Sequence, residues 1–265
     1  MKFPALRMVN LKKYHAALKQ FVLFLTFLLA FGCGTPKYHV TKIEGKEIGV
    51  TDKNTEVPAI EAFIKPYRDN IDKDMNVVLA YAPETLDKSG EWQCAIGNVM
   101  ADATLDLSNR VFLKRENKKI DMCLLNFGGI RSIIPKGNIT TRTAFEIMPF
   151  ENSVIVTELK GEEILEMISY IITEKKAHPI SGLAFKIGTD KIAEDIRING
   201  QAFDPYRTYL VVTSDYLVNG GDNMNFFRKS LHNYDLDYKL RNVLIDYFRE
   251  KDTIKAPTDI RISKG

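Results

Sequence analysis

The sequence predicts an α+β domain with a mixed sheet and flanking helices. Apolar residues recur with helical spacing in several segments, and they alternate or cluster as in strands in several others. The two kinds of segment do not follow a strict strand–helix–strand rhythm, and a hairpin signal stands among them, which favours a mixed sheet. With 265 residues, 45% of them hydrophobic, the chain can bury a substantial core in one domain.

The first 32 residues are predicted to be a signal peptide of the lipoprotein type. An apolar run at 21–31 follows a basic region, and it is shorter than the about 20 residues of a membrane span. Small residues just before Cys33 resemble a bacterial lipoprotein cleavage site, so we expect Cys33 to become the lipidated N-terminus. An ordinary cleaved signal peptide and an uncleaved anchor are the alternatives. In each case the chain is exported.

Residues 33–54 are expected to be a polar tether, and residues 55–265 the folded domain. A strand-like alternation at 38–43 is predicted to join the edge of that domain. The formal charge of +3 lies largely in the leader, so no basic face for nucleic acid is expected. Cys94 and Cys123 have no CxxC partner, and we interpret them as two buried thiols.

Helical spacing of apolar residues predicts helices at 57–73, 93–111 and 161–174. Thr140 or Thr141 can cap a short helix that ends at Ile147, and Asp235 is expected to cap a final helix that ends at Glu250. The expected strands are 76–81, 121–125, 153–159, 183–187, 209–214 and 260–262. The pair Asn199-Gly200 predicts a hairpin with a type I′ turn.

The segment Asn126-Phe127-Gly128-Gly129-Ile130-Arg131 follows a buried strand directly. The Asn126 amide offers a donor and an acceptor, which complement the edge of a purine or pyrimidine. Gly128 and Gly129 allow backbone to approach a ligand closely, and the Arg131 fork suits phosphate or carboxylate. The alternative is a tight turn beside a surface arginine.

Two aromatic residues and one carboxylate lie in loops elsewhere in the chain. Phe150 follows Pro149, and Tyr216 follows the strand 209–214, so the two rings could sandwich a base. Asp222 follows two glycines and could bind ribose hydroxyls. The alternatives are a core position for Phe150 and an Asx turn for Asp222.

These motifs, together with Gly97-Asn98, resemble the C-terminal domain of the 5′-nucleotidase family over about residues 55–265. That family includes UDP-sugar hydrolases and 2′,3′-cyclic nucleotide phosphodiesterases. The resemblance implies that Phe150 and Tyr216 stack on the base and that Asn126 binds its edge. It also implies that Arg131 contacts phosphate and Asp222 the ribose.

The chain departs from the usual pattern of this family at three places. Tyr216 stands where Phe is more common, and Phe127 replaces the first glycine of a Gly-Gly-Gly run. The stretch 88–93 lacks the arginines that often precede the Gly-Asn pair, which weakens the expected hold on phosphate. Lys88 could substitute for them, whereas Glu91 would repel phosphate.

The resemblance also implies that chemistry takes place in an N-terminal metallophosphoesterase domain with two metal ions. The four histidines of this chain stand outside such ligand patterns, so neither catalytic residues nor metal ligands are expected in it. We therefore expect a nucleotide-binding half whose two divalent metal ions come with a separate metallophosphatase chain. The alternatives are a stand-alone nucleoside-binding lipoprotein and a structural lipoprotein, in each case anchored on the periplasmic side of the bacterial envelope.

Overall fold

The computed structural model describes residues 14–30, 38–49, 51, 55 and 57–265, which form two separate units. In the first unit, α1 spans His15–Ala30, and residues 38–49 contain neither helix nor strand. The strand expected at 38–43 is therefore wrong: its side chains are exposed, so its alternation has no core to face. Cys33 lies outside the described residues. No helix in the described ranges is long and apolar enough to cross a membrane.

The second unit, residues 57–265, is built around a five-stranded mixed sheet with the order β10-β4-β9-β2-β5. β2 pairs in parallel with β9, and the other pairs are antiparallel. The strands are β2 Met122–Leu124, β4 Ser153–Lys160, β5 Ile180–Ser181, β9 Thr208–Ser214 and β10 His232–Lys239. This architecture confirms the predicted α+β class.

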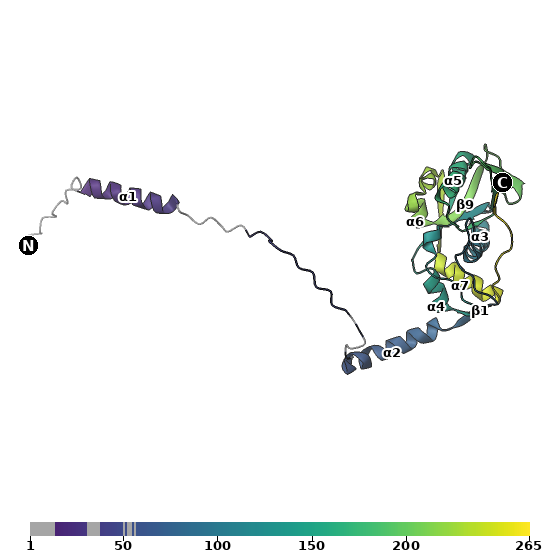
Figure 1. Ribbon diagram of the computed structural model, residues 1–265, viewed down its shortest axis with the longest axis horizontal. Helices are drawn as coiled ribbons and strands as arrows, with labels where there is room; N and C mark the ends of the chain where they lie inside the picture. Colours follow the sequence, from purple (N-terminus) through teal and green to yellow (C-terminus); the bar gives the residue numbers. More distant parts are fainter. Residues whose placement is uncertain (1–13, 31–37, 50, 52–54, 56) are drawn as a thin grey trace, which may run out of the picture. The chain divides into compact units, whose positions relative to one another are not determined.

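Both faces of this sheet are buried because its strands alternate between two hydrophobic cores. On β2, Cys123 belongs to one core, whereas Met122 and Leu124 belong to the other. The first core is completed by α3 (Ala95–Glu116), α4 (Thr141–Ile147) and α7 (Leu240–Lys251). The second contains the inner face of α5 (Gly161–Glu174), so α5 and α7 lie on opposite sides of β9 (Figure 1).

Two smaller sheets flank the central one. β1 (Val78–Ala82) pairs with β3 (Gly137–Thr140), and Thr140 caps α4 as predicted. The second small sheet has the order β11-β6-β7-β8, with β6 Leu183–Ile187, β7 Ala193–Ile198, β8 Gln201–Ala202 and β11 Ile262–Lys264. Asn199 and Gly200, at φ 49° and 76°, form the predicted turn between β7 and β8.

The final helix begins later than predicted. Asp235 lies within β10, and α7 begins at Leu240. The alternation of Tyr234, Leu236 and Tyr238 fits a strand, and β10 takes the free edge of β4. The Asp235 carboxylate accepts from the Asp237 N–H at 2.8 Å, so this residue forms a local turn in the strand instead of a helix cap.

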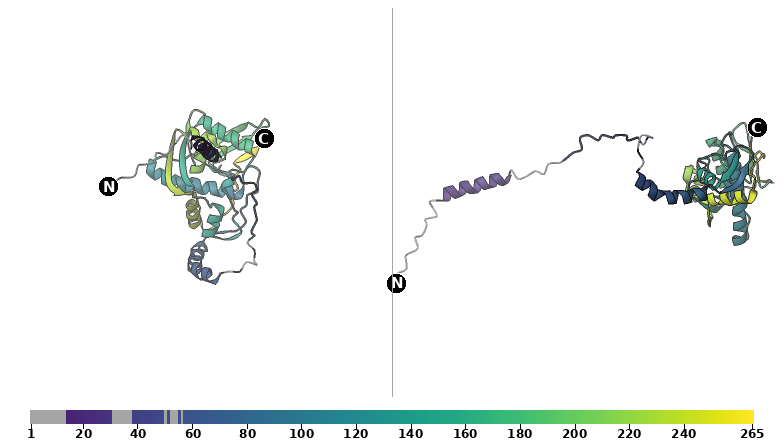
Figure 2. Two further views of the ribbon diagram at one scale, coloured as in Figure 1. Left: turned by 90° about the vertical axis from the view of Figure 1, so that its left-hand side faces the viewer. Right: turned by 90° about the horizontal axis from the view of Figure 1, so that it is seen from below.

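Helix α2 (Pro58–Met75) projects from the rest of its unit (Figure 1, Figure 2). The predicted helix is present, but none of its residues is buried. Phe63 and Tyr67 are 70% and 63% exposed, so the apolar face expected to pack inward is open. An ion pair of 2.7 Å between Asp72 and Arg142 joins the helix to α4.

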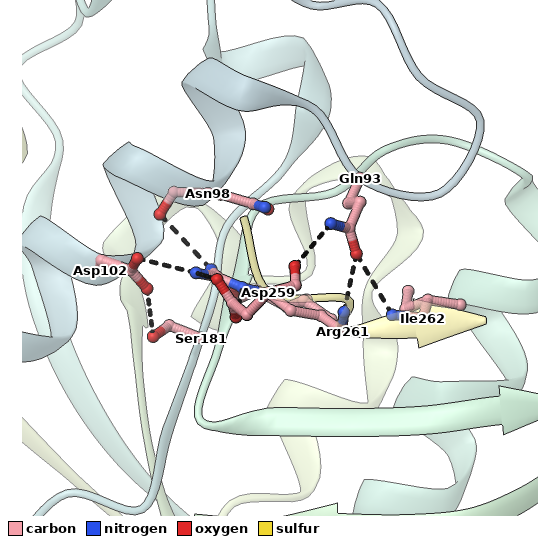
Figure 3. A network of polar contacts seen from close by, with 8 residues as sticks. Gln93, Asn98, Asp102, Ser181, Asp259, Arg261 and Ile262 are labelled. Carbon is pink, nitrogen blue, oxygen red and sulfur yellow. Dashed lines mark hydrogen bonds and ion pairs between the residues drawn. The ribbon is translucent and has the colours of Figure 1, made fainter. Parts of the chain in front are cut away.

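A buried arginine fastens the C-terminal segment to the domain, in addition to the pairing of β11 with β6 (Figure 3). Arg261 is 5% exposed, and its guanidinium donates to Asp102 at 2.7 Å and to Asp259 at 2.8 Å. It also donates to the carbonyl of Ile180, while its own N–H donates to Gln93 Oε1 at 2.8 Å. The network therefore links α3, β5 and the segment that leads into β11.

Candidate functional site

The first wall of the site is the turn that follows β2. Asn126 has extended backbone and precedes the short 3₁₀ helix η2, Phe127–Gly129. A Cβ atom at Gly129 would lie 2.7 Å from Asn126 Oδ1, so only glycine leaves the amide its place. The Arg131 N–H donates to the Ile147 carbonyl at 2.9 Å, which joins this wall to the end of α4.

The second wall is the segment around Phe150, whose backbone is held by Arg241. This arginine of α7 is 7% exposed and donates to the carbonyls of Met148 and Pro149 at 3.4 Å and 3.2 Å. It also pairs with Glu151. The segment is thus fixed through its backbone, and the Phe150 ring remains 42% exposed.

The third wall follows β9 and comprises α6 (Asp215–Val218) and two 3₁₀ helices, η3 (Gly221–Asn223) and η4 (Asn225–Lys229). Gly220 and Asp222 have φ of 86° and 51°, and this left-handed backbone turns the Asp222 carboxylate back toward Tyr216. A side chain at Gly221 would collide with the Tyr216 ring.

The three walls enclose one cavity of about 320 Å³. It is lined by all seven residues expected to bind a ligand, namely Asn126, Gly128, Gly129, Arg131, Phe150, Tyr216 and Asp222. Asn152 also lines it and was not predicted. The sequence offered one weak signal for Asn152, which is a polar residue two positions after Phe150. The ligand-binding roles of the seven residues stay predictions.

Asp222 is the centre of the polar contacts in this pocket. Its Oδ2 accepts from the Asn126 amide at 2.8 Å, and its Oδ1 accepts from the Tyr216 hydroxyl at 2.8 Å. The bond to this carboxylate raises the pKa of Tyr216, so the hydroxyl keeps its proton. Asp222 thereby connects the first wall with the third.

The cations near the pocket are partly engaged by other groups. The Arg131 guanidinium lies 5.8 Å from the centre of the Phe150 ring, and its Nη1 donates weakly to the Gly128 carbonyl at 3.4 Å. Lys88 donates to the Ile130 carbonyl at 2.8 Å and lies 4.1 Å from the centre of the Phe127 ring. Lys88, the possible substitute for the missing arginines, and Phe127 are therefore in contact.

Glu91, which was expected to repel phosphate, does not line this pocket. Its carboxylate pairs with Lys264 at 2.5 Å, and it lines a different cavity beside Trp92. Cys94 and Cys123 are free and buried, in agreement with the sequence interpretation. Burial raises the pKa of both thiols, so both stay protonated. No group of three or more His, Cys, Asp or Glu in the described ranges could hold a metal ion.

Residues 77–229 match a family model described as the C-terminal domain of 5′-nucleotidase. An apyrase of Tabanus yao is 27% identical over 78% of this chain and 41% of its own length. The 5′-nucleotidase of Homo sapiens is 24% identical over 84% of the chain and 43% of its own length. A solved 5′-nucleotidase precursor from Thermus thermophilus superposes with a TM-score of 0.64 at 24% identity, covering 78% of this chain and 42% of that one.

The chain thus spans about two fifths of the length of these relatives. The matched region contains β2, β4, β9 and the three walls of the pocket. The chain belongs to the family of 5′-nucleotidase C-terminal domains.

Proposed function

We propose that this chain is the nucleotide- or nucleoside-binding half of an exported 5′-nucleotidase-type phosphoester hydrolase. The observation that carries the proposal is the cavity between the three walls, in which two half-exposed rings, an amide, a carboxylate and a guanidinium meet. Such a cavity suits a planar base with a hydroxylated, anionic substituent.

Each wall contributes a different kind of contact. Phe150 and Tyr216 stack on the base, and the Asn126 amide binds its edge. The Asp222 carboxylate accepts hydrogen bonds from ribose hydroxyls, because its two oxygens have acceptor capacity beyond the bonds to Asn126 and Tyr216. Arg131 contacts the phosphate.

Two divalent metal ions are proposed to reach the substrate with a separate metallophosphatase chain. The described residues do not fit these ions, since they offer no cluster of candidate ligands. When bound, such ions would activate water and stabilise phosphoryl oxygens. The residues of this chain are therefore assigned binding and orientation of the substrate, and none of them is assigned a catalytic step.

We also propose that the chain is a lipoprotein anchored through Cys33 on the periplasmic side of the bacterial envelope. The support is the basic leader, its apolar run at 21–31 and the small residues before Cys33. A membrane anchor would keep the pocket close to exported partner proteins.

A stand-alone nucleoside-binding lipoprotein is the second candidate. The engagement of Arg131 with Phe150 and Gly128, and of Lys88 with Phe127 and Ile130, favours it. Cations held in this way offer less to a phosphate, so a nucleoside would bind as well as its monophosphate. A calorimetric comparison of adenosine with its monophosphate separates the two candidates.

Phosphate release tests the two-chain enzyme. The purified mature chain is mixed with a candidate exported metallophosphatase, divalent metal and a nucleoside monophosphate. We expect the mixture to release phosphate faster than the phosphatase alone, and chelation of the metal to abolish the gain. Equal rates with and without this chain, for the phosphatases encoded beside it, would contradict the proposal.

Adenosine binding tests the pocket itself. We expect Phe150→Ala and Tyr216→Ala each to weaken binding roughly fivefold or more, because stacking of a base is worth about 1–3 kcal/mol. Isothermal calorimetry at millimolar ligand measures the affinity. Phe63→Ala, at an exposed ring on α2, is the matched control and should leave affinity unchanged. Full affinity in both pocket variants would show that the rings do not hold the base.

A further inference from the structure

One pair of aromatic residues lies behind two walls of the pocket without lining it. Tyr170 of α5 donates its hydroxyl proton to the Asp222 carbonyl at 2.7 Å. Its ring lies 5.6 Å from the ring of His178, measured between centroids. His178 Nδ1 in turn accepts from the Phe127 N–H at 3.2 Å. A continuous chain of contacts therefore runs from the Asp222 loop to the Asn126–Gly129 turn.

We propose that Tyr170 and His178 are positioning residues that couple the two walls on which the base and the ribose are recognised. The inference rests on the proposed function for the identity of the ligand, but the coupling itself is a property of the free protein. We call the two residues the brace. Neither residue lines the cavity, so each acts through the wall that it holds.

Both walls need support from outside their own sequence. The Phe127 N–H opens the turn η2, and no side chain of the preceding residue caps it. His178 supplies the missing acceptor. On the other wall, Gly220 and Asp222 have left-handed backbone, which is unfavourable for a residue with a side chain such as aspartate. The bond from Tyr170 holds the Asp222 carbonyl in that conformation.

The chemistry of His178 favours a positioning role over a purely stabilising one. The ring is 2% exposed, and its Nε2 has no hydrogen-bond partner among the described residues. Because Nδ1 accepts, Nε2 carries the proton of the neutral ring, and a buried donor without a partner is unfavourable. An apolar side chain would avoid that cost, but it would leave the Phe127 N–H without its acceptor.

The brace keeps the two walls in place when a ligand binds. In the free pocket, Asn126 is already held by its 2.8 Å bond to Asp222. Ribose hydroxyls that approach Asp222 bind the remaining acceptor positions of the same carboxylate. The brace lies behind both walls, so it keeps their separation fixed while the carboxylate accepts from the ligand as well. The second N–H and the oxygen of the Asn126 amide then stay available to the base without the turn moving.

Two measurements on the full mature chain test the coupling. Amide hydrogen exchange is followed in the free protein for residues 126–130 and 220–224, and adenosine affinity is measured by calorimetry. Tyr170→Phe removes the hydroxyl and keeps the ring. Tyr206→Phe, at a ring that is 97% exposed, is the matched control. His178→Leu removes the acceptor, whereas His178→Asn places an amide oxygen close to the position of Nδ1.

We expect Tyr170→Phe to speed exchange in both segments and to weaken adenosine roughly five- to tenfold, which corresponds to about one hydrogen bond. His178→Leu should act in the same way, and His178→Asn should restore most of the protection at Phe127. Faster exchange at 220–224 alone in Tyr170→Phe would overturn the coupling. Amide exchange is measured without ligand. If the wild-type chain fails to bind adenosine, the proposed function is contradicted, but the exchange data still test the coupling.

Discussion

At the scale of single residues, Asp222 is the residue on which most of the polar contacts in the site depend. Its carboxylate accepts from Asn126 and from Tyr216, and its carbonyl accepts from Tyr170. It also has the left-handed backbone that turns it inward. Few positions combine so many constraints, so any substitution there disturbs both the ligand contacts and the shape of the loop.

His178 makes the stability of the domain depend on pH. Burial, and to a lesser extent Lys176, lowers the pKa of His178 from 6.5 to about 4, while Glu174 and Asp222 oppose that shift. Between these two values the unfolded chain binds the extra proton. The free energy of unfolding should therefore be full above about pH 6.5 and fall by about 3 kcal/mol as the pH drops to about 4.

Urea unfolding of the wild-type chain and of His178→Asn at intervals from pH 4 to 7 measures this effect. We expect the dependence on pH to flatten in the variant, because asparagine does not titrate. Carboxylates whose pKa values are lowered in the folded protein, such as Asp259, lose their contribution to the free energy of unfolding at lower pH. That loss is the same in both proteins. Parallel curves would exclude His178 as the source.

Seven of the eight residues that line the pocket could be predicted from the sequence, whereas Asn152 and the residues behind the pocket could not. Asn126 and Tyr216 stand just after a strand, and Arg131 and Asp222 stand shortly after a glycine pair, so these positions can be recognised in the sequence. His178 is separated from its partner Phe127 by 51 residues, and only the pairing of β2 with β5 brings them together. No local pattern signals that contact.

At the scale of elements, helix α2 shows what periodicity can and cannot predict. The spacing of Ile60, Phe63, Ile64, Tyr67 and Ile71 predicted the helix correctly. It could not say whether a partner element covers the apolar face, because that depends on the rest of the fold. Conversely, β10 was mistaken for the start of α7, since the helix-capping tendency of Asp235 also suits a turn inside a strand.

The exposure of α2 predicts unequal effects of the same substitution in two helices. Phe63→Ala on α2 should change the free energy of unfolding by less than about 0.5 kcal/mol, since the ring is 70% exposed. Phe248→Ala on α7 should cost roughly 3–5 kcal/mol, because that ring is fully buried in the first core. Chemical denaturation measures both. A large loss in Phe63→Ala would mean that another surface covers α2 in solution.

At the scale of the whole molecule, the central sheet separates two cores, and the pocket forms among the loops at one end of its strands. The mixed sheet and most helices followed from the sequence because their hydrophobic patterns are long and regular. The position of the C-terminal segment did not follow from it. That position depends on the pairing of β11 with β6 and on the buried Arg261, whose distant partners are Asp102 of α3 and the Ile180 carbonyl of β5.

Substitution of Arg261 should therefore make the C-terminal segment unfold locally before the rest of the domain. Arg261→Met leaves Asp102 with only its bond from the Ser181 hydroxyl and takes a charged donor from the Ile180 carbonyl, and we expect a loss of roughly 3 kcal/mol in the free energy of unfolding. Arg249→Met removes a surface pair with Asp246 and should cost less than about 1 kcal/mol. Limited proteolysis followed by mass spectrometry locates the first cut. Equal losses in the two variants would contradict the role of Arg261.

The contact between Lys88 and Phe127 has a consequence for substitutions at either position. The ammonium lies over the ring and also holds the Ile130 carbonyl, so each residue is part of the other's surroundings. Phe127→Gly alone would remove the ring that lies beneath the Lys88 ammonium, and Lys88→Arg alone would place a larger guanidinium against the Phe127 ring. The two changes are therefore expected to be epistatic, so that neither is neutral without the other.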